Sequence, residues 1–184
     1  LGKGPAYLSI VAAGEPMWLG ALSAPNSIFV HANRPLISEN GTSTIVHEMV
    51  HVLLAELKTP DDQDWVDEGL AEYFALRPLR DSGTISQTRY VQTITSLREW
   101  GSKVRNLRAT ASTGPITARA VTVFHDLDAE LRRGTDNRSN LASLVRGLLS
   151  DGETAELQSL RRRTQQLTGQ SSRSLAHTAV PGFD

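Results

Sequence analysis

The sequence predicts an α+β fold, in which a small N-terminal sheet packs on a pair of helices and a helical lobe follows. Three observations support this class. Short apolar runs broken by Gly and Pro fill residues 1–38, helical spacing begins near residue 40, and four more helix-like segments cover residues 85–168. Residues 169–184 show no period and are expected to form an irregular tail. A chain of 184 residues has the size of one domain, so we expect a single domain over residues 1–184.

The first 38 residues are expected to form strands rather than helices. Each apolar run is only five to seven residues long and is flanked by the breakers Gly14, Pro16 and Pro25. Lengths of this kind are typical of strands and too short for a stable helix. The expected strands are Ala6–Ala12, Trp18–Leu22 and Ser27–His31.

The next segment, residues 40–78, is expected to form a helix pair. From Asn40 to Leu57 apolar residues recur every three or four positions, which is the spacing of one helix face. A second helix is expected to take its N-cap from Asp61 or Asp62 and to end at Pro78, because proline disfavours a continuing helix. Four helices then make up the expected lobe: Ile85–Lys103, Pro115–Arg133, Ser139–Leu149 and Glu153–Leu167.

Composition limits the possible chemistry. The chain has no cysteine, which excludes disulfide frameworks, thiolate metal sites and cysteine nucleophiles, so a metal ion could be held only by His and carboxylate side chains. The net charge of -1 argues against nucleic-acid binding driven by overall charge. No apolar run reaches the length of a transmembrane helix. The chain begins at Leu1 without the pattern of a signal peptide, and the absence of cysteine is compatible with a periplasmic or secreted location.

The most informative segment is His47-Glu48-Met49-Val50-His51. Two His four residues apart lie on the same helix face, one turn from each other, so their ring nitrogens can converge on one Zn²⁺. Glu48 is rotated by about 100° from His47, beside the ion, where a carboxylate can take a proton from a metal-bound water. The alternative is a pair of ordinary surface histidines on an amphipathic helix.

A catalytic zinc site needs a third protein ligand. Glu68 and Glu72 lie one turn apart on the next expected helix, which must run back beside the first after a short turn. The two acids stand among Trp, Leu, Ala, Tyr and Phe, where a buried charge needs a partner. A solvated acidic helix face is the alternative interpretation.

At these residues the sequence resembles the gluzincin zinc metallopeptidases, and among them the alanyl- and glycyl-aminopeptidase-like catalytic domains. Those families read W-x-x-E-G-x-A-x-Y after the zinc helix, and the segment from Trp65 to Tyr73 matches that string. The resemblance implies a thermolysin-like fold, one Zn²⁺ per chain, and hydrolysis of a peptide or protein substrate. It implies that His47, His51 and Glu68 bind the metal and that Glu48 is the general base. Glu72, or alternatively Asp67, would accept a hydrogen bond from a ligand imidazole.

The sequence departs from the aminopeptidase pattern at two places. Ser23 stands where those enzymes carry the Glu that binds the substrate amino terminus, so strict aminopeptidase specificity is not expected. Thr117 stands where they carry the Tyr that stabilises the oxyanion, which leaves Tyr90 and His125 as substitute catalytic donors. Zinc-dependent peptide hydrolysis is therefore the expected function. The rivals are a zinc-binding, catalytically impaired domain that binds peptides or proteins, and a helical domain without metal.

Overall fold

The computed structural model describes residues 4–183, which form a three-stranded sheet and six helices, as the α+β class predicts. Two compact units divide these residues: the N-terminal unit comprises residues 4–55 and 71–93, and the C-terminal unit comprises residues 56–70 and 94–183. Two of the unit boundaries fall inside the helices Asp64–Asp81 and Gln87–Gly101, and the third, between residues 55 and 56, lies in the turn before Asp64. The elements are β1 (Ser9–Ala13), β2 (Ala21–Ala24), β3 (Ser27–His31), α1 (Thr44–Leu53), α2 (Asp64–Asp81), α3 (Gln87–Gly101), α4 (Pro115–Gly134), α5 (Leu141–Asp151) and α6 (Leu157–Thr168).

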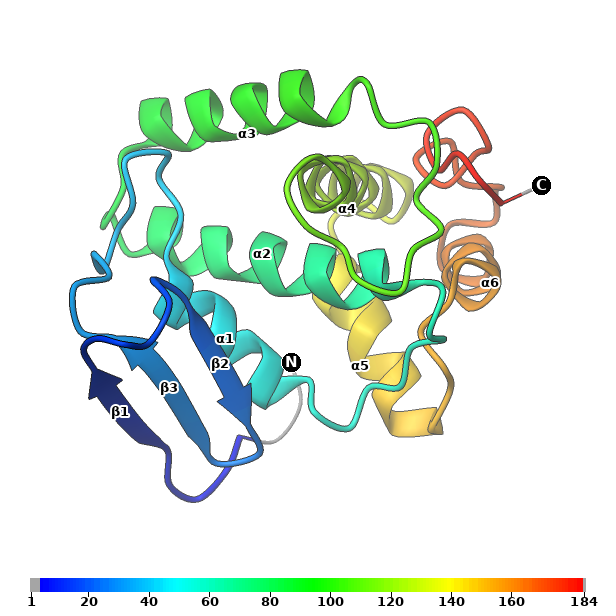
Figure 1. The fold of residues 1–184 in the computed structure, drawn as a ribbon. Helices are drawn as coiled ribbons and strands as arrows, with labels where there is room; N and C mark the ends of the chain where they lie inside the picture. Colours follow the sequence, from blue (N-terminus) through cyan, green and yellow to red (C-terminus); the bar gives the residue numbers. More distant parts are fainter. Residues whose placement is uncertain (1–3, 184) are drawn as a thin grey trace. The chain divides into compact units, whose positions relative to one another are not determined.

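In the N-terminal unit, β3 is the central strand of the sheet. It pairs in parallel with β1 and antiparallel with β2, with Ile10 opposite Ile28 and Ala21 opposite Val30. Helix α1 covers one face of this sheet (Figure 1). Ile28 and Val30 are buried on that face against Val52 of α1, so apolar burial fixes which side of α1 faces the sheet.

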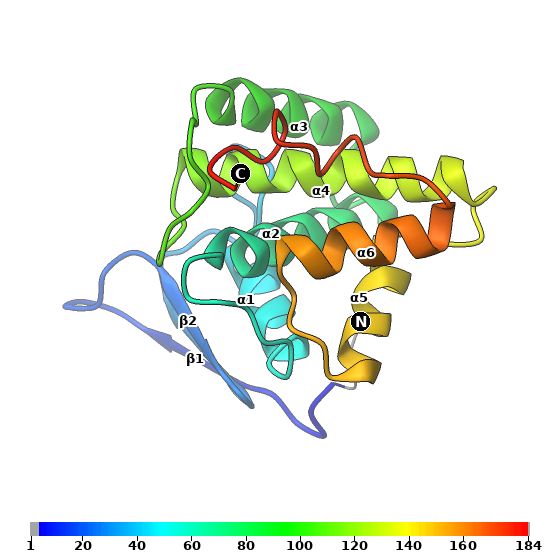
Figure 2. The ribbon, with the colours of Figure 1, turned by 90° about the vertical axis from the view of Figure 1, so that its right-hand side faces the viewer.

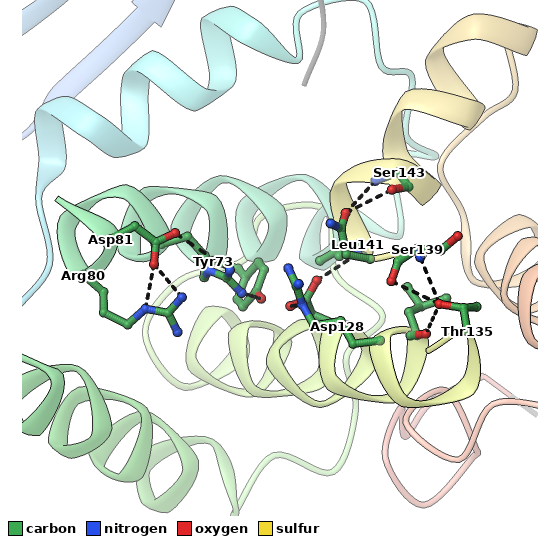
Figure 3. Close-up of polar contacts among 12 residues, drawn as sticks. Tyr73, Arg80, Asp81, Asp128, Thr135, Ser139, Leu141 and Ser143 are labelled. Atoms are coloured by element: carbon green, nitrogen blue, oxygen red, sulfur yellow. Dashed lines mark hydrogen bonds and ion pairs between the residues drawn. The ribbon is translucent and has the colours of Figure 1, made fainter. Parts of the chain in front are cut away.

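In the C-terminal unit, α4, α5 and α6 pack on one another (Figure 2). The first turn of α2 joins them through Trp65, which is fully buried and stacks on Phe124 of α4 with ring centroids 5.6 Å apart. Buried Asp128 of α4 accepts a hydrogen bond of 2.8 Å from the Leu141 N–H at the start of α5 (Figure 3). A carboxylate at this position satisfies a backbone donor that a helix start leaves free.

The tail is irregular, as predicted, but it is firmly attached to α4. Leu175 and Val180 are fully buried, so this polar-looking segment contributes to the core of the C-terminal unit. Glu130 of α4 accepts hydrogen bonds from the backbone N–H groups of Arg173 and Ser174. Burial alone would raise the pKa of Glu130, but these bonds outweigh burial and hold the pKa below its usual value.

Helices α1 and α2 both begin later than the sequence predicts. Helix α1 begins at Thr44 rather than near Asn40, because Ser43 adopts an extended conformation and its hydroxyl accepts from the Val46 N–H as an N-cap. Helix α2 begins at Asp64 rather than beside Asp61 or Asp62, after a turn in which the Gln63 N–H donates to the Pro60 carbonyl.

Pro78 does not end α2, which continues through it to Asp81. Proline removes one backbone donor, but the turn beyond it is held by a hydrogen bond from the Ser82 N–H to the Pro78 carbonyl. Leu76 and Leu79 on either side are buried, so packing offsets the lost hydrogen bond. None of the described helices is long and apolar enough to cross a membrane.

The remaining boundaries differ from expectation by a few residues. β1 begins at Ser9 and β2 spans Ala21–Ala24, both later than predicted, whereas β3 has the predicted limits. Helix α6 begins at Leu157 instead of Glu153, because the backbone just before Leu157 makes hydrogen bonds that are not helical. The Ala155 N–H donates to the Lys58 carbonyl, and the Glu156 side chain closes a capping box with Ser159.

Candidate metal centre

Helix α1 turns its two histidines to the same side, away from the sheet. Ile45 and Val52 of α1 pack toward the sheet, and the helical repeat of about 100° per residue then places His47 and His51 on the other side. The two Nε2 atoms lie 3.0 Å apart and the ring planes are 74° apart. Tetrahedral ligands about 2.1 Å from one zinc ion lie about 3.4 Å apart, so this separation is close to that of two ligands on one ion.

A carboxylate from α2 fixes the orientation of the first imidazole. Oε2 of Glu72 lies 2.8 Å from Nδ1 of His47, and both side chains are largely buried, with 15% and 14% of their surface exposed. Because an ionised carboxylate can only accept, Nδ1 of His47 carries the proton in this contact. The neutral imidazole then presents the lone pair of Nε2 toward His51, which is the tautomer that a metal ligand needs.

Glu68 stands one turn before Glu72 on the same unbroken helix, so the two carboxylates share one helix face. One carboxylate oxygen of Glu68 and one ring nitrogen from each of His47 and His51 all lie within 4.8 Å of one another. Two imidazoles and one carboxylate form a donor set that suits Zn²⁺ and leaves a position for water or substrate. The residues present therefore fit the ion that the resemblance implies.

Glu48 is a mostly buried acidic residue of α1. Only 9% of its surface is exposed, yet no hydrogen bond or ion pair engages its carboxylate within residues 4–183. A carboxylate without a protein partner on a mostly buried residue can accept hydrogen bonds from a water molecule or a ligand. Glu48 follows His47 directly on α1, beside the histidine pair. A water molecule at the histidine pair could donate a hydrogen bond to the Glu48 carboxylate, and a cation there could attract its negative charge.

The carboxylate in contact with His47 is Glu72, the first of the two candidates for that role. Asp67 lies in the first turn of α2, near Asp64. Burial raises the pKa of Asp64, and repulsion from Glu68 and Asp67 adds to this, although the Ser112 N–H donates to its carboxylate.

The two candidate oxyanion donors make contacts of other kinds. The Tyr90 ring is 4% exposed and lies under the Arg80 guanidinium, 4.8 Å from ring centroid to Cζ, near the C-terminal end of α2. Nδ1 of His125 lies 3.1 Å from Oδ1 of Asp126, a carboxylate that Arg98 also binds through both oxygens. Burial opposes ionisation of Asp126, but the bonds to His125 and Arg98 lower its pKa well below the usual range.

Sequence reasoning missed one residue of this region, Arg34. Its guanidinium bonds to Thr44 in the first turn of α1, one turn before His47. No motif surrounds Arg34 in the sequence, so only the folded chain reveals this position.

The chain was compared with protein families, with curated proteins and with solved structures. No family model, curated protein or solved structure matches it. Its function must therefore be inferred from the residues of α1 and α2 and their geometry.

Proposed function

We propose that this protein is a zinc-dependent peptidase of the gluzincin type, with a thermolysin-like catalytic fold. The observation that carries the proposal is the joint arrangement of His47, His51 and Glu68 beside the buried, unpartnered carboxylate of Glu48. A structural role for the three donors would not require a free carboxylate next to them. A hydrolytic role requires one, because the attacking water must lose a proton.

His47, His51 and Glu68 would hold the ion, and Glu72 keeps His47 in the ligating tautomer. When bound, zinc supplies Lewis-acid chemistry: it polarises a carbonyl group and lowers the pKa of a water molecule. Glu48 takes the proton from the attacking water and later delivers it to the leaving amine. No hydrogen bond or ion pair within residues 4–183 occupies the Glu48 carboxylate, so it is available to accept this proton.

The donor that stabilises the oxyanion remains a prediction from sequence, with His125 and Tyr90 as the candidates. Tyr90 already packs under Arg80 and His125 already contacts Asp126, so either side chain would need to act alongside these contacts. This observation favours a second candidate function, a zinc-binding domain that holds peptides without cleaving them. The unpartnered Glu48 favours the peptidase, because a binding domain has no need of a base.

The test combines metal analysis with a peptide digest. Protein loaded with zinc and freed of excess metal should contain about one zinc per chain, and His51→Ala should lose it. His177→Ala is the matched control, because His177 is exposed in the tail, outside the donor cluster. Zinc-loaded protein should cleave members of a random peptide library, with products read by mass spectrometry, and a chelator should stop cleavage. Zinc binding with peptide binding but no cleavage would establish the binding domain instead, and absence of zinc would refute both.

A further inference from the structure

An arginine with no acidic partner among the described residues bonds to the first turn of α1, the helix that carries both histidines. Arg34 follows β3, and its Nε donates to Oγ1 of Thr44 over 2.8 Å, while Nη1 donates to the Leu19 carbonyl over 3.3 Å. All of these groups belong to the N-terminal unit. The side chain is therefore held between the residues that precede β2 and the first turn of α1.

The helical repeat places Arg34 on the same side of α1 as the proposed catalytic residues. At about 100° per residue, Thr44 and Glu48 lie within about 40° of each other around the helix axis, and both histidines lie within about 60° of Thr44. Thr44 and His47 are three residues apart, and Cβ atoms at this spacing are about 5–6 Å from each other. Thr44, to which the guanidinium bonds, thus lies about one helical turn before His47 and Glu48 on α1.

The partners of Arg34 leave its charge uncompensated. Both acceptors are uncharged oxygens, and no carboxylate within residues 4–183 forms an ion pair with Arg34. Of the other arginines of the N-terminal unit, Arg77 and Arg80 both pair with Asp81, whereas Arg89 donates to the backbone carbonyls of Ser38 and Glu39. Nη2 of Arg34 has no partner among the described residues, so one edge of a half-buried guanidinium remains available to an anion.

We propose that Arg34 binds a carboxylate of the peptide substrate; this rests on the proposed peptidase function and specifies its substrate class. A guanidinium fits a carboxylate through two parallel hydrogen bonds, and partial burial strengthens the pair. One extended peptide residue spans about 3.3–3.6 Å, so the carboxylate lies about two residues from the scissile bond. It is either the C-terminal α-carboxylate of a short peptide or an Asp or Glu side chain at that distance.

The binding test separates these two sources without requiring turnover. The probes are acetyl-Ala-Ala-Phe-Leu-Ala as the free acid, the same peptide as the C-terminal amide, and the amide with Glu as its last residue. They are titrated by calorimetry into zinc-loaded Glu48→Gln protein. The expected result is that one or both carboxylate-bearing peptides bind about tenfold more tightly than the neutral amide. Preference for the free acid alone identifies a C-terminal carboxylate, and preference shared by the Glu peptide identifies any carboxylate.

Variants assign that preference to Arg34. Arg34→Gln, added to the Glu48→Gln protein, should make the carboxylate-bearing peptides and the neutral amide bind about equally tightly. Arg34→Lys should retain part of the preference for the carboxylate-bearing peptides. Arg146→Gln is the matched control, because Arg146 is exposed and bonds only to Ser143 within its own helix. If Arg34→Gln does not fold, as judged by circular dichroism, Arg34→Lys decides alone. A preference unchanged by that variant overturns the proposal.

Other outcomes distinguish this proposal from the peptidase proposal. Equal binding of all three peptides, or no binding at all, overturns the carboxylate site. Arg34-dependent preference in a protein that never cleaves a peptide supports the site and refutes the peptidase. Cleavage by wild-type protein at the same kcat/KM for acid, Glu peptide and neutral amide supports the peptidase and refutes the site.

Discussion

The contact between His47 and Glu72 allows the clearest quantitative prediction. Glu72→Gln keeps the size of the side chain but removes its negative charge, so the carboxylate that orients the imidazole is lost. The 2.8 Å contact joins two side chains that are each about 85% buried, so solvent screens it little. Hydrogen bonds to charged groups contribute about 1.5–3 kcal/mol, which corresponds to a loss of about 10–100-fold in zinc affinity. The same range is typical of partners that orient metal-binding histidines.

The assay is competition for zinc with a chromophoric chelator at neutral pH. Glu99→Gln is the matched control, since Glu99 is an exposed helical glutamate in α3 that should leave the affinity unchanged. Thermal unfolding of the metal-free proteins separates a loss of metal affinity from a loss of fold. A Glu72→Gln protein that binds zinc within twofold of wild type would refute the idea that Glu72 sets the tautomer of His47.

Two further predictions concern the C-terminal unit. Gly69→Ala should lower the free energy of unfolding by about 1–2 kcal/mol in urea titrations. An added Cβ would lie 2.6 Å from the Ala120 Cβ and 2.9 Å from the Phe124 ring. A variant more stable than wild type would contradict this close packing. Folding lowers the pKa of Glu130, so the ionised carboxylate stabilises the folded state. This contribution to the free energy of unfolding is complete above the ordinary glutamate pKa of about 4.3 and is lost as the pH falls through the lower pKa of the folded state. In NMR titrations the Ser174 amide should therefore shift with a midpoint below 4.3, and a midpoint at or above that value would contradict the assigned hydrogen bonds.

The sequence predicts the elements of this fold well because their signals are local. The apolar spacing of the zinc-motif helix and the short runs before it identify α1 and the strands from neighbouring residues alone. The errors concern groups whose effect depends on distant contacts. Pro78 is a reliable helix breaker in isolation, but here burial of Leu76 and Leu79 holds α2 together across it. Likewise, nothing local shows that Leu175 and Val180 of the tail are core residues.

The candidate site is predictable in part for the same reason. The i, i+4 spacing fixes His47 and His51 on one helix face, and the same rule places Glu68 and Glu72 on the next. That Glu72 is in contact with His47 follows from how α1 and α2 pack, which a periodic pattern does not specify. Arg34 is invisible to sequence reasoning, because its bond to Thr44 depends on the path of the loop after β3.

The central claim is that Glu48 is the base of a zinc-dependent hydrolysis. The most direct measurement is the rate of peptide hydrolysis by Glu48→Gln and wild-type proteins at equal, verified zinc content. General-base catalysis typically contributes about 10²–10⁴-fold, so the variant should retain one zinc per chain and lose at least a hundredfold in rate. Hydrolysis by the zinc-loaded variant at a rate close to that of wild type would contradict the account.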